Sequence, residues 1–85
     1  MSLQLRKAAL SVPLNIAEGR GRFTVPDQRH FFYQARGSVA EVDTLIESAR
    51  RQGFISADRA ATLSAQTAEV GRLVNGLIRA LTPKA

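Results

Sequence analysis

The sequence of 85 residues contains no cysteine and a single histidine, His30. Without cysteine, neither disulfides nor thiolate metal sites can hold the fold together, and one histidine without a nearby pair of carboxylates does not complete a metal site. No apolar run reaches the roughly 18 residues that a membrane-spanning helix needs, and no secretory signal segment opens the chain. These absences predict a soluble, cytoplasmic protein without metal or other cofactor.

The residue patterns of common enzymes are also missing. Ser11 and Ser38 have no histidine at a spacing typical of an activated nucleophile. No second carboxylate accompanies Glu18 at a spacing that indicates general acid–base catalysis, and no glycine-rich phosphate loop is present. The sequence therefore predicts a protein that is not an enzyme and takes no small-molecule substrate.

What the sequence does contain is apolar residues and positive charge. Hydrophobic residues make up 45% of the chain and charged residues 22%, a balance typical of a globular protein. The length allows one core, so residues 1–85 are predicted to form a single domain. The net charge of +5 and a pI near 11.1 favour an anionic partner, with nucleic acid ahead of a membrane surface.

The positive charge is concentrated at the two ends of the sequence. Residues 1–22 carry Arg6, Lys7, Arg20 and Arg22 against Glu18 alone, whereas residues 23–53 are neutral. Most of the cations are arginine, whose planar guanidinium binds phosphate through two hydrogen bonds. A GC-rich genome produces the same enrichment, so arginine content alone does not establish a phosphate-binding role.

Hydrophobic periodicity predicts three amphipathic helices at about residues 3–18, 26–52 and 56–82. Ser56 and Thr24 stand at the N-cap positions of the third and second helices, and Gly53 with Phe54 is typical of a Schellman ending. No alternating strand pattern is present. The expected fold is all-α, an antiparallel up-and-down helical bundle with short loops.

Proline and glycine interrupt these helices at defined points. Pro13 is expected to kink or divide the first helix, with Ser11 able to cap its second half. Gly19 is expected to end that helix with a positive φ. Close approach of neighbouring helices is the expected reason for three further helical glycines, Gly37, Gly71 and Gly76. The alternative is that one or two of them only mark exposed positions that tolerate glycine.

Two segments carry a resemblance to a known family. Residues 4–19, QLRKAALSVPLNIAEG, resemble the signature of the four-helix bundle proteins that are encoded in bacterial 23S rRNA intervening sequences. Residues 31–32 and 35–42, the latter ARGSVAEV, are similar to a second segment of that family, and residues 53–55 match its loop. The resemblance implies structural roles for the residues that match the motifs, namely Pro13, Asn15, Glu18, Gly19, Gly37 and Glu41.

Members of this family usually carry one more amphipathic helix before the first motif. The resemblance therefore implies that this chain contains three of the four helices and exposes the groove that the other helix fills. An apolar patch of that size favours association. The resemblance accordingly implies a homo-oligomer, a pentamer or another ring.

Arg6, Lys7, Arg20 and Arg22 form the first predicted site, a basic cluster that binds the phosphates of RNA or DNA. Arg20 and Arg22 lie in a glycine-spaced loop that can adapt to phosphates. Glu18 is interpreted either as an ion-pair partner of a nearby arginine such as Arg22, or as a hydrogen-bond acceptor that holds the kinked helix and its loop. A purely structural role for these charges remains the alternative.

Arg29, Tyr33 and Arg36 form a second predicted site, because their spacing of four and then three residues places them on one helix face. Cations with an aromatic ring between them can contact phosphates and stack on a base. A solvated face stabilised by ion pairs is the alternative, with Arg36 paired to Asp43 and Arg51 paired to Glu47.

The sequence thus favours a non-enzymatic, oligomeric helical protein that binds nucleic acid through its basic surface. The alternative is an adaptor or structural protein whose open groove accepts an amphipathic helix of another protein. A remnant reading frame without a selected biochemical role is also compatible with the sequence.

Overall fold

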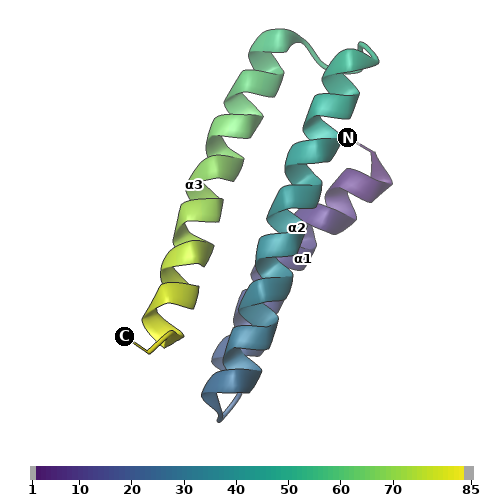
Figure 1. The fold of residues 1–85 in the computed structure, drawn as a ribbon. Coiled ribbons are helices and arrows are strands. Elements are labelled where there is room, and N and C mark those ends of the chain that lie inside the picture. Colours follow the sequence, from purple (N-terminus) through teal and green to yellow (C-terminus); the bar gives the residue numbers. More distant parts are fainter. Residues whose placement is uncertain (1, 84–85) are drawn as a thin grey trace.

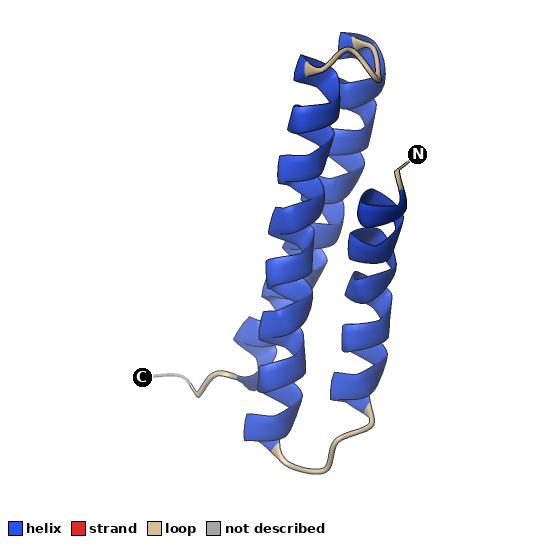
Figure 2. Cartoon of the chain, turned by 90° about the vertical axis from the view of Figure 1, so that its right-hand side faces the viewer, coloured by secondary structure: helices blue, strands red, loops and turns tan. Residues whose placement is uncertain are grey.

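The computed structural model describes residues 2–83, which form three α-helices and no strand. The helices are α1 (Leu3–Arg20), α2 (Val25–Arg51) and α3 (Ala57–Leu81). Figure 1 shows α2 and α3 side by side, and Figure 2 shows α1 joined to α2 at one end of the molecule while α2 joins α3 at the other. The prediction of an all-helical chain with three helices is confirmed.

The second helix, α2, is the central element of the molecule. Both α1 and α3 pack along it, whereas α1 and α3 scarcely contact each other. The Cα atoms consequently extend over 44 × 26 × 13 Å, which is a flat layer of helices. A layer that is one helix thick buries only part of the surface of each helix, so apolar residues of all three helices stay accessible to solvent.

Serine and threonine side chains fix the starts of the helices. Ser56 Oγ accepts a hydrogen bond from the backbone N–H of Arg59 (3.0 Å), and Thr24 Oγ1 accepts one from Asp27 (3.3 Å). Each bond satisfies a backbone donor that has no partner within the helix. Both N-caps agree with the sequence prediction, and α2 starts at Val25, with Pro26 in its first turn.

Gly53 ends α2 as the sequence predicts. Its φ is +80°, its N–H donates to Arg50 O (3.1 Å), and the N–H of Phe54 donates to Ala49 O (2.9 Å). These two bonds define a Schellman motif. The ring of Phe54 does not fold back onto the helix, because 76% of the residue is exposed.

Replacing Gly53 with alanine is expected to lower the free energy of unfolding by about 1 kcal/mol. A side chain at positive φ costs roughly 1–2 kcal/mol, and the lower entropy of the unfolded alanine chain offsets part of that cost. Urea denaturation followed by circular dichroism measures the change. Gly21→Ala is the matched control, because Gly21 has φ −82° and should be neutral or stabilising; equal destabilisation of both variants would contradict the assignment.

The prediction that Gly19 ends α1 with a positive φ is wrong. Gly19 lies inside α1, which continues to Arg20, and it is buried; within residues 2–83 the only positive φ belongs to Gly53. A Cβ atom on Gly19 would lie 2.6 Å from Cε1 of Phe32 and 3.1 Å from the carbonyl oxygen of Gln28. The glycine is therefore required by close packing of α1 on α2 rather than by a left-handed helix ending.

Pro13 does not divide α1, which is helical from Leu3 to Arg20. Ser11 consequently does not cap a second helix. Its Oγ lies 2.8 Å from Ser38 Oγ of α2, and Asn15 Nδ2 donates to the carbonyl oxygen of Ser11 (2.8 Å) and to its Oγ (3.0 Å). These three side chains make a polar tie between α1 and α2 beside the proline.

The other helical glycines differ from one another. A Cβ atom on Gly71 would lie 3.5 Å from Cγ1 of Val39, an ordinary contact between α3 and α2. Nothing lies within 4 Å of such an atom on Gly37, and on Gly76 it would meet only Arg79 of the same helix. The prediction of close helix approach is wrong for Gly37 and Gly76.

Two hydrophobic clusters hold the three helices together. One lies toward the α2–α3 turn and includes Leu5, Ile46 and Ala60. The other includes Phe32, which is 4% exposed, and Val74, which is fully buried. No buried polar or charged residue occurs among residues 2–83, so burial of apolar surface is the main stabilising contribution to the fold.

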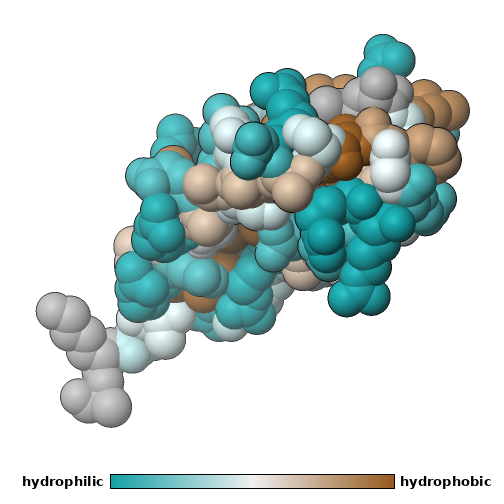
Figure 3. All heavy atoms as spheres, turned by 90° about the horizontal axis from the view of Figure 1, so that it is seen from above, coloured by the Kyte–Doolittle hydropathy of each residue, from teal (hydrophilic) through white to brown (hydrophobic). Residues whose placement is uncertain are grey.

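Large apolar residues also remain at the surface. Leu3, Leu10 and Leu14, spaced at i, i+7 and i+11, are 56–63% exposed along the outer side of α1. Seen from the end of the molecule with the α2–α3 turn, hydrophobic residues reach the surface between hydrophilic ones (Figure 3). Exposed apolar stripes such as the leucine row of α1 are typical of contact surfaces.

None of the helices within residues 2–83 is long and apolar enough to cross a membrane.

Candidate nucleic-acid interface

The structure separates the basic cluster that the sequence predicts. Arg6 and Lys7 lie in the first turns of α1, while Arg20 is its last residue. Fourteen residues of helix rise about 21 Å, so these cations lie toward opposite ends of α1. The prediction of one cluster of four is therefore wrong, and the two pairs have to be treated separately.

A different set of cations lies together where the α1–α2 turn meets the end of α3. Figure 2 shows these segments at the same end of the molecule, and a hydrogen bond from Arg29 Nη2 to Leu81 O (3.1 Å) joins α2 to α3 there. We call this region the basic end and define it by Arg20, Arg22, Arg29 and Arg79. It brings together cations that lie far apart in the sequence.

Arg22 is held in place within the basic end. Its Nη2 lies 3.0 Å from Oε2 of Glu18, and its Cζ lies 4.6 Å from the centroid of the Phe31 ring. The predicted pairing of Glu18 with Arg22 is confirmed. An ion pair and a cation–π contact together restrict the guanidinium, whereas Arg20 makes no ion pair within residues 2–83.

Besides Arg79, sequence reasoning also missed Phe23, which lies next to Arg22 of the basic end. It is fully exposed, at 103% of its reference area, and it directly follows Arg22 in the α1–α2 turn. A hydrophobic aromatic residue inside an arginine- and glycine-rich loop is the signal that identifies it. An exposed ring next to cations provides a stacking surface for a nucleic-acid base.

The predicted stripe of Arg29, Tyr33 and Arg36 is only partly formed. Arg29 is half-buried and donates a hydrogen bond to the carbonyl oxygen of Leu81 at the end of α3. This bond satisfies a carbonyl group that has no partner within the helix. The Nε of Arg29 is buried without a hydrogen-bond partner among residues 2–83. Tyr33 and Arg36 are exposed, and Arg36 Cζ lies 4.8 Å from the Tyr33 ring centroid. Arg29 thus stabilises the packing of α2 on α3, whereas Tyr33 and Arg36 are exposed and accessible to a ligand.

The remaining motif residues lie either in contacts between helices or at the exposed surface. Asn15 belongs to the polar tie, and Gly19 to the contact with Phe32. Glu41 is exposed and makes no ion pair within residues 2–83. His30 is exposed beside Gln34, and no cluster of three metal-ligating side chains occurs within the described part of the chain.

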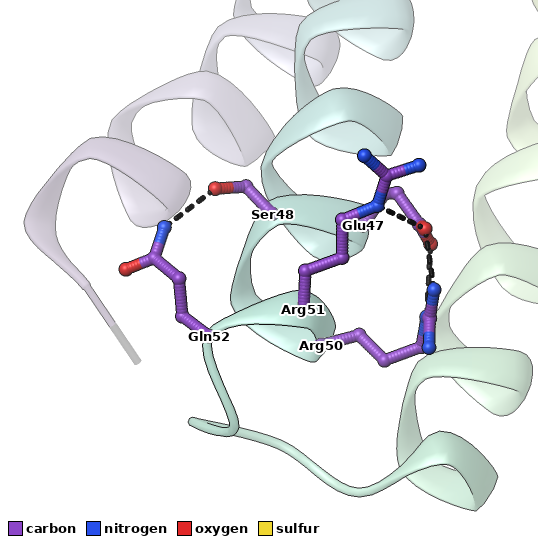
Figure 4. Close-up of polar contacts among 5 residues, drawn as sticks. All are labelled: Glu47, Ser48, Arg50, Arg51 and Gln52. Atoms are coloured by element: carbon purple, nitrogen blue, oxygen red, sulfur yellow. Dashed lines mark hydrogen bonds and ion pairs between the residues drawn. The ribbon is translucent and has the colours of Figure 1, made fainter.

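Two arginines at the end of α2 share one carboxylate. Figure 4 shows Glu47 between Arg50 and Arg51; Arg50 Nη2 lies 2.6 Å and Arg51 Nε 3.0 Å from Oε1 of Glu47. The predicted pair of Glu47 with Arg51 is confirmed. Arg36, however, lies over Tyr33 and makes no ion pair with Asp43 within residues 2–83.

Hydrogen bonds from Arg50 and then Arg51 lower the pKa of Glu47 from 4.5 to about 2, and the same contact raises the pKa of Arg50. Because the folded-state pKa is depressed, the stabilisation is present above about pH 4.5 and is lost as the pH falls toward 2. Its size is small, since the side chains are 41–74% exposed to solvent.

Titration of the Glu47 carboxyl by NMR is expected to show a midpoint near 2 in the wild type. In the double variant Arg50→Gln, Arg51→Gln, the midpoint should return toward 4.5, because both donors are gone. A wild-type midpoint near 4.5 would contradict the ion pairs.

An apolar groove crosses the layer on one face and is lined by residues of all three helices. Its volume is about 410 Å³. We call this surface the apolar groove and define it by its lining residues, Leu5, Ala9, Val12, Pro13, Ile16, Val39, Val42, Ile46, Leu63, Gln66, Thr67 and Val70. The groove exists because α1 and α3 flank α2 without closing over it.

The fold, the basic end and the apolar groove together define a small all-helical protein with a positively charged end and an apolar groove. The model of one family, the 23S rRNA-intervening sequence proteins, matches residues 1–76. The chain belongs to this family, and the resemblance seen in its motifs is confirmed. A comparison with curated proteins gave no match.

Proposed function

We propose that this member of the family is a non-enzymatic, oligomeric, cytoplasmic protein that binds nucleic acid through its basic end. The observation that carries the proposal is the fully exposed Phe23, which lies in a turn beside Arg20 and Arg22. Stacking on an aromatic ring supplies affinity for any base, and the cations supply phosphate contacts. Single-stranded segments of a structured RNA or DNA, with unstacked bases, suit this surface best.

The charges at the basic end are suited to this role in different ways. Arg20 is exposed and free of ion pairs within residues 2–83, so a phosphate does not have to displace a carboxylate from it. Arg22 is oriented by Phe31 and Glu18 before any ligand arrives. Tyr33 and Arg36 on α2 extend the surface with a second ring and cation.

Oligomerisation is part of the same proposal. The three helices provide most of an antiparallel up-and-down bundle, and the exposed leucines of α1 are a surface that association would bury. In a ring such as a pentamer, several basic ends would act on one nucleic acid and raise its affinity. Light scattering coupled to gel filtration should give a mass several times 9.2 kDa; a mass of one chain at micromolar concentration would contradict it.

Fluorescence anisotropy with a labelled RNA hairpin tests the binding site. Replacement of Phe23 or Arg20 by alanine is expected to weaken binding by about tenfold each, because one stacking or phosphate contact contributes about 1–3 kcal/mol. Arg51→Ala is the matched control, since it removes the same charge at the other end of α2, where Arg51 is paired with Glu47. Equal affinity of all three variants and the wild type would overturn the proposed interface.

A second candidate function is favoured by the apolar groove. Grooves of this kind bind amphipathic helices through apolar anchor residues. The chain would then act as an adaptor that holds another protein.

A further inference from the structure

Glu18 places a carboxylate beside the cations of the basic end. Its side chain is 59% exposed, and its Oε2 lies 3.0 Å from Nη2 of Arg22. A carboxylate next to an arginine weakens phosphate binding, because it repels the phosphate and competes for the guanidinium. Since exposed ion pairs also contribute little to stability, the main consequence of this pair is the set of hydrogen-bonding groups that it presents to solvent.

Contacts from two helices hold Arg22 in place. Its N–H donates to Gly19 O (3.2 Å), its carbonyl oxygen accepts from Gln28 Nε2 (2.9 Å), and its Cζ lies 4.6 Å from the centroid of the Phe31 ring. The side chain is nevertheless 46% exposed. The guanidinium is thus restricted in position and still accessible to a ligand.

The ring of Phe31 is supported in turn by its neighbours on α2. The rings of Phe31 and His30 meet edge to face, with centroids 5.2 Å apart and an angle of 75° between their planes. Nε2 of His30 lies 3.1 Å from Nε2 of Gln34. Because these side chains are already ordered, a ligand that contacts Arg22 pays less conformational entropy on binding.

The ion pair lies apart from the apolar groove and next to the exposed ring. None of Glu18, Arg22 and Phe31 lines the groove, so the pair is accessible whatever occupies that surface. Phe23 directly follows Arg22 and is fully exposed. A strand with one base stacked on Phe23 therefore brings a neighbouring base to the ion pair.

The ion pair presents its hydrogen-bonding groups in a fixed order. Because the contact is made through Oε2, the order across the pair is the guanidinium of Arg22, then Oε2 and then Oε1 of Glu18. Within residues 2–83, Oε1 makes no hydrogen bond and Oε2 makes only this one. Guanidinium N–H groups only donate and carboxylate oxygens only accept, so the pair offers a donor followed by two acceptors.

Guanine is the base whose Watson–Crick edge complements this order. Its O6 accepts a hydrogen bond, whereas its N1–H and its 2-amino group donate. With O6 against Arg22, the two donors of guanine face the two oxygens of Glu18. Two parallel hydrogen bonds to one carboxylate are charge-assisted, and they are stronger than bonds between neutral groups.

The other three bases do not complement the pair. Cytosine has the same order of groups as the pair itself, so a donor faces a donor and acceptors face acceptors. Adenine and uracil each place an acceptor, N1 or O2, against the carboxylate. Polar groups that lose water without gaining a partner lower the affinity, so the pair discriminates by repulsion as well as by attraction.

We propose that the Glu18–Arg22 pair binds an unpaired guanine of a nucleic-acid strand through its Watson–Crick edge, which makes Glu18 a specificity-determining residue. The inference rests on the proposed nucleic-acid-binding function and names the base. Glu18 accepts from N1–H and the 2-amino group, Arg22 donates to O6, and Phe23 stacks on a neighbouring base. A guanine within a duplex is not bound in this way, because its partner base occupies the same edge.

Four RNA hairpins test the selectivity of the full-length protein. They share one stem and a uridine loop in which a single central base is G, A, C or U. Fluorescence anisotropy is expected to show the G hairpin bound about tenfold more tightly than the C hairpin, with the other two between them. Equal binding of all four would overturn the inference and leave the nucleic-acid-binding function intact, whereas no binding of any hairpin would overturn both.

Two matched variants separate base recognition from net charge. Glu18→Gln removes the carboxylate of the pair, and Asp27→Asn removes the same charge from an exposed side chain in the first turn of α2 that makes no ion pair within residues 2–83. Both variants are expected to bind the hairpins more tightly, because one negative charge is gone. Only Glu18→Gln is expected to lose the preference for guanine; retention of the preference in Glu18→Gln, or its loss in both variants, would overturn the role of Glu18.

Inosine locates the contact with the carboxylate. It lacks the 2-amino group of guanosine but keeps O6 and N1–H. The wild type is expected to bind the inosine hairpin about tenfold more weakly than the G hairpin, because one hydrogen bond to a charged acceptor is lost. Glu18→Gln should bind the two hairpins equally. Equal binding by the wild type would show that Glu18 does not read the 2-amino group and would contradict the proposal.

Competition with guanosine monophosphate identifies the source of the guanine. The free nucleotide has the same edge but no neighbouring base to stack on Phe23. It is therefore expected to displace the G hairpin only at concentrations at least about a hundredfold above those of the unlabelled hairpin. Displacement at equal concentrations would mean that the pair binds a free nucleotide rather than a strand, and the proposal would be wrong.

Discussion

Replacement of Phe32 by alanine is expected to lower the free energy of unfolding by about 3–5 kcal/mol, the range for removal of a buried aromatic side chain. The ring is 4% exposed and belongs to the cluster that contains Val12 of α1 and Val74 of α3. Its loss therefore removes contacts of α2 with both neighbours. In a domain of this size that is a large part of the total stability, so urea denaturation should show a much lower midpoint.

Phe23→Ala is the control for this experiment, because Phe23 is a phenylalanine with no buried surface. Surface replacements of this kind change stability by no more than about 0.5 kcal/mol. Similar denaturation midpoints for the two variants would mean that Phe32 does not lie in the core.

Replacement of Gly19 by valine is the second change with a large expected effect, a loss of about 2–3 kcal/mol. The Cβ atom alone would lie 2.6 Å from Cε1 of the buried Phe32 ring, and the two methyl groups of valine add further overlap. Overpacking of a core costs about 1–3 kcal/mol. The gain in helix propensity over glycine, a few tenths of a kcal/mol, does not offset it.

Gly37→Val is the matched control, since Gly37 lies within α2 with nothing within 4 Å of a Cβ atom. Its stability should stay within about 0.5 kcal/mol of the wild type. The cost at Gly19 should also shrink in a Phe32→Leu background, because the two residues are in contact and their effects are coupled. Additive effects would show that the Phe32 ring is not what Gly19 accommodates.

The helices themselves could be predicted because their signals are local. The apolar repeat of α3, the caps Thr24 and Ser56, and the Gly53 ending each depend on residues within two turns of one another. Their observed bounds differ from the expected ones by one or two residues. The largest such difference, the extension of α1 to Arg20, arises at Gly19.

Contacts between different helices could not be predicted from the sequence, as Gly19 shows. A glycine near the end of a helix is most often a left-handed ending, and nothing nearby in the sequence distinguishes that from contact with Phe32, thirteen residues later. Arg29 is a similar case, because its partner Leu81 is 52 residues away. Contacts across helices depend on how the helices pack, which periodicity alone does not determine.

The candidate interface was predicted in part. Arg20 and Arg22 lie together as expected, but Arg6 and Lys7 do not, because α1 remains one helix and separates them by its length. Phe23 was missed since the sequence alone does not show that its ring stays outside the core. Exposure of that ring changes the expected interface from a patch of charge to a charged stacking surface.

The salt dependence of RNA affinity tests the central claim of nucleic-acid binding most directly. Binding of the hairpin by the wild type should weaken steeply between about 50 and 200 mM salt, because each neutralised phosphate releases counterions. Arg20→Ala should reduce the slope of log affinity against log salt by about 0.7–0.9, the contribution of one phosphate contact. No binding at low salt, or an affinity that does not depend on salt, would contradict the account.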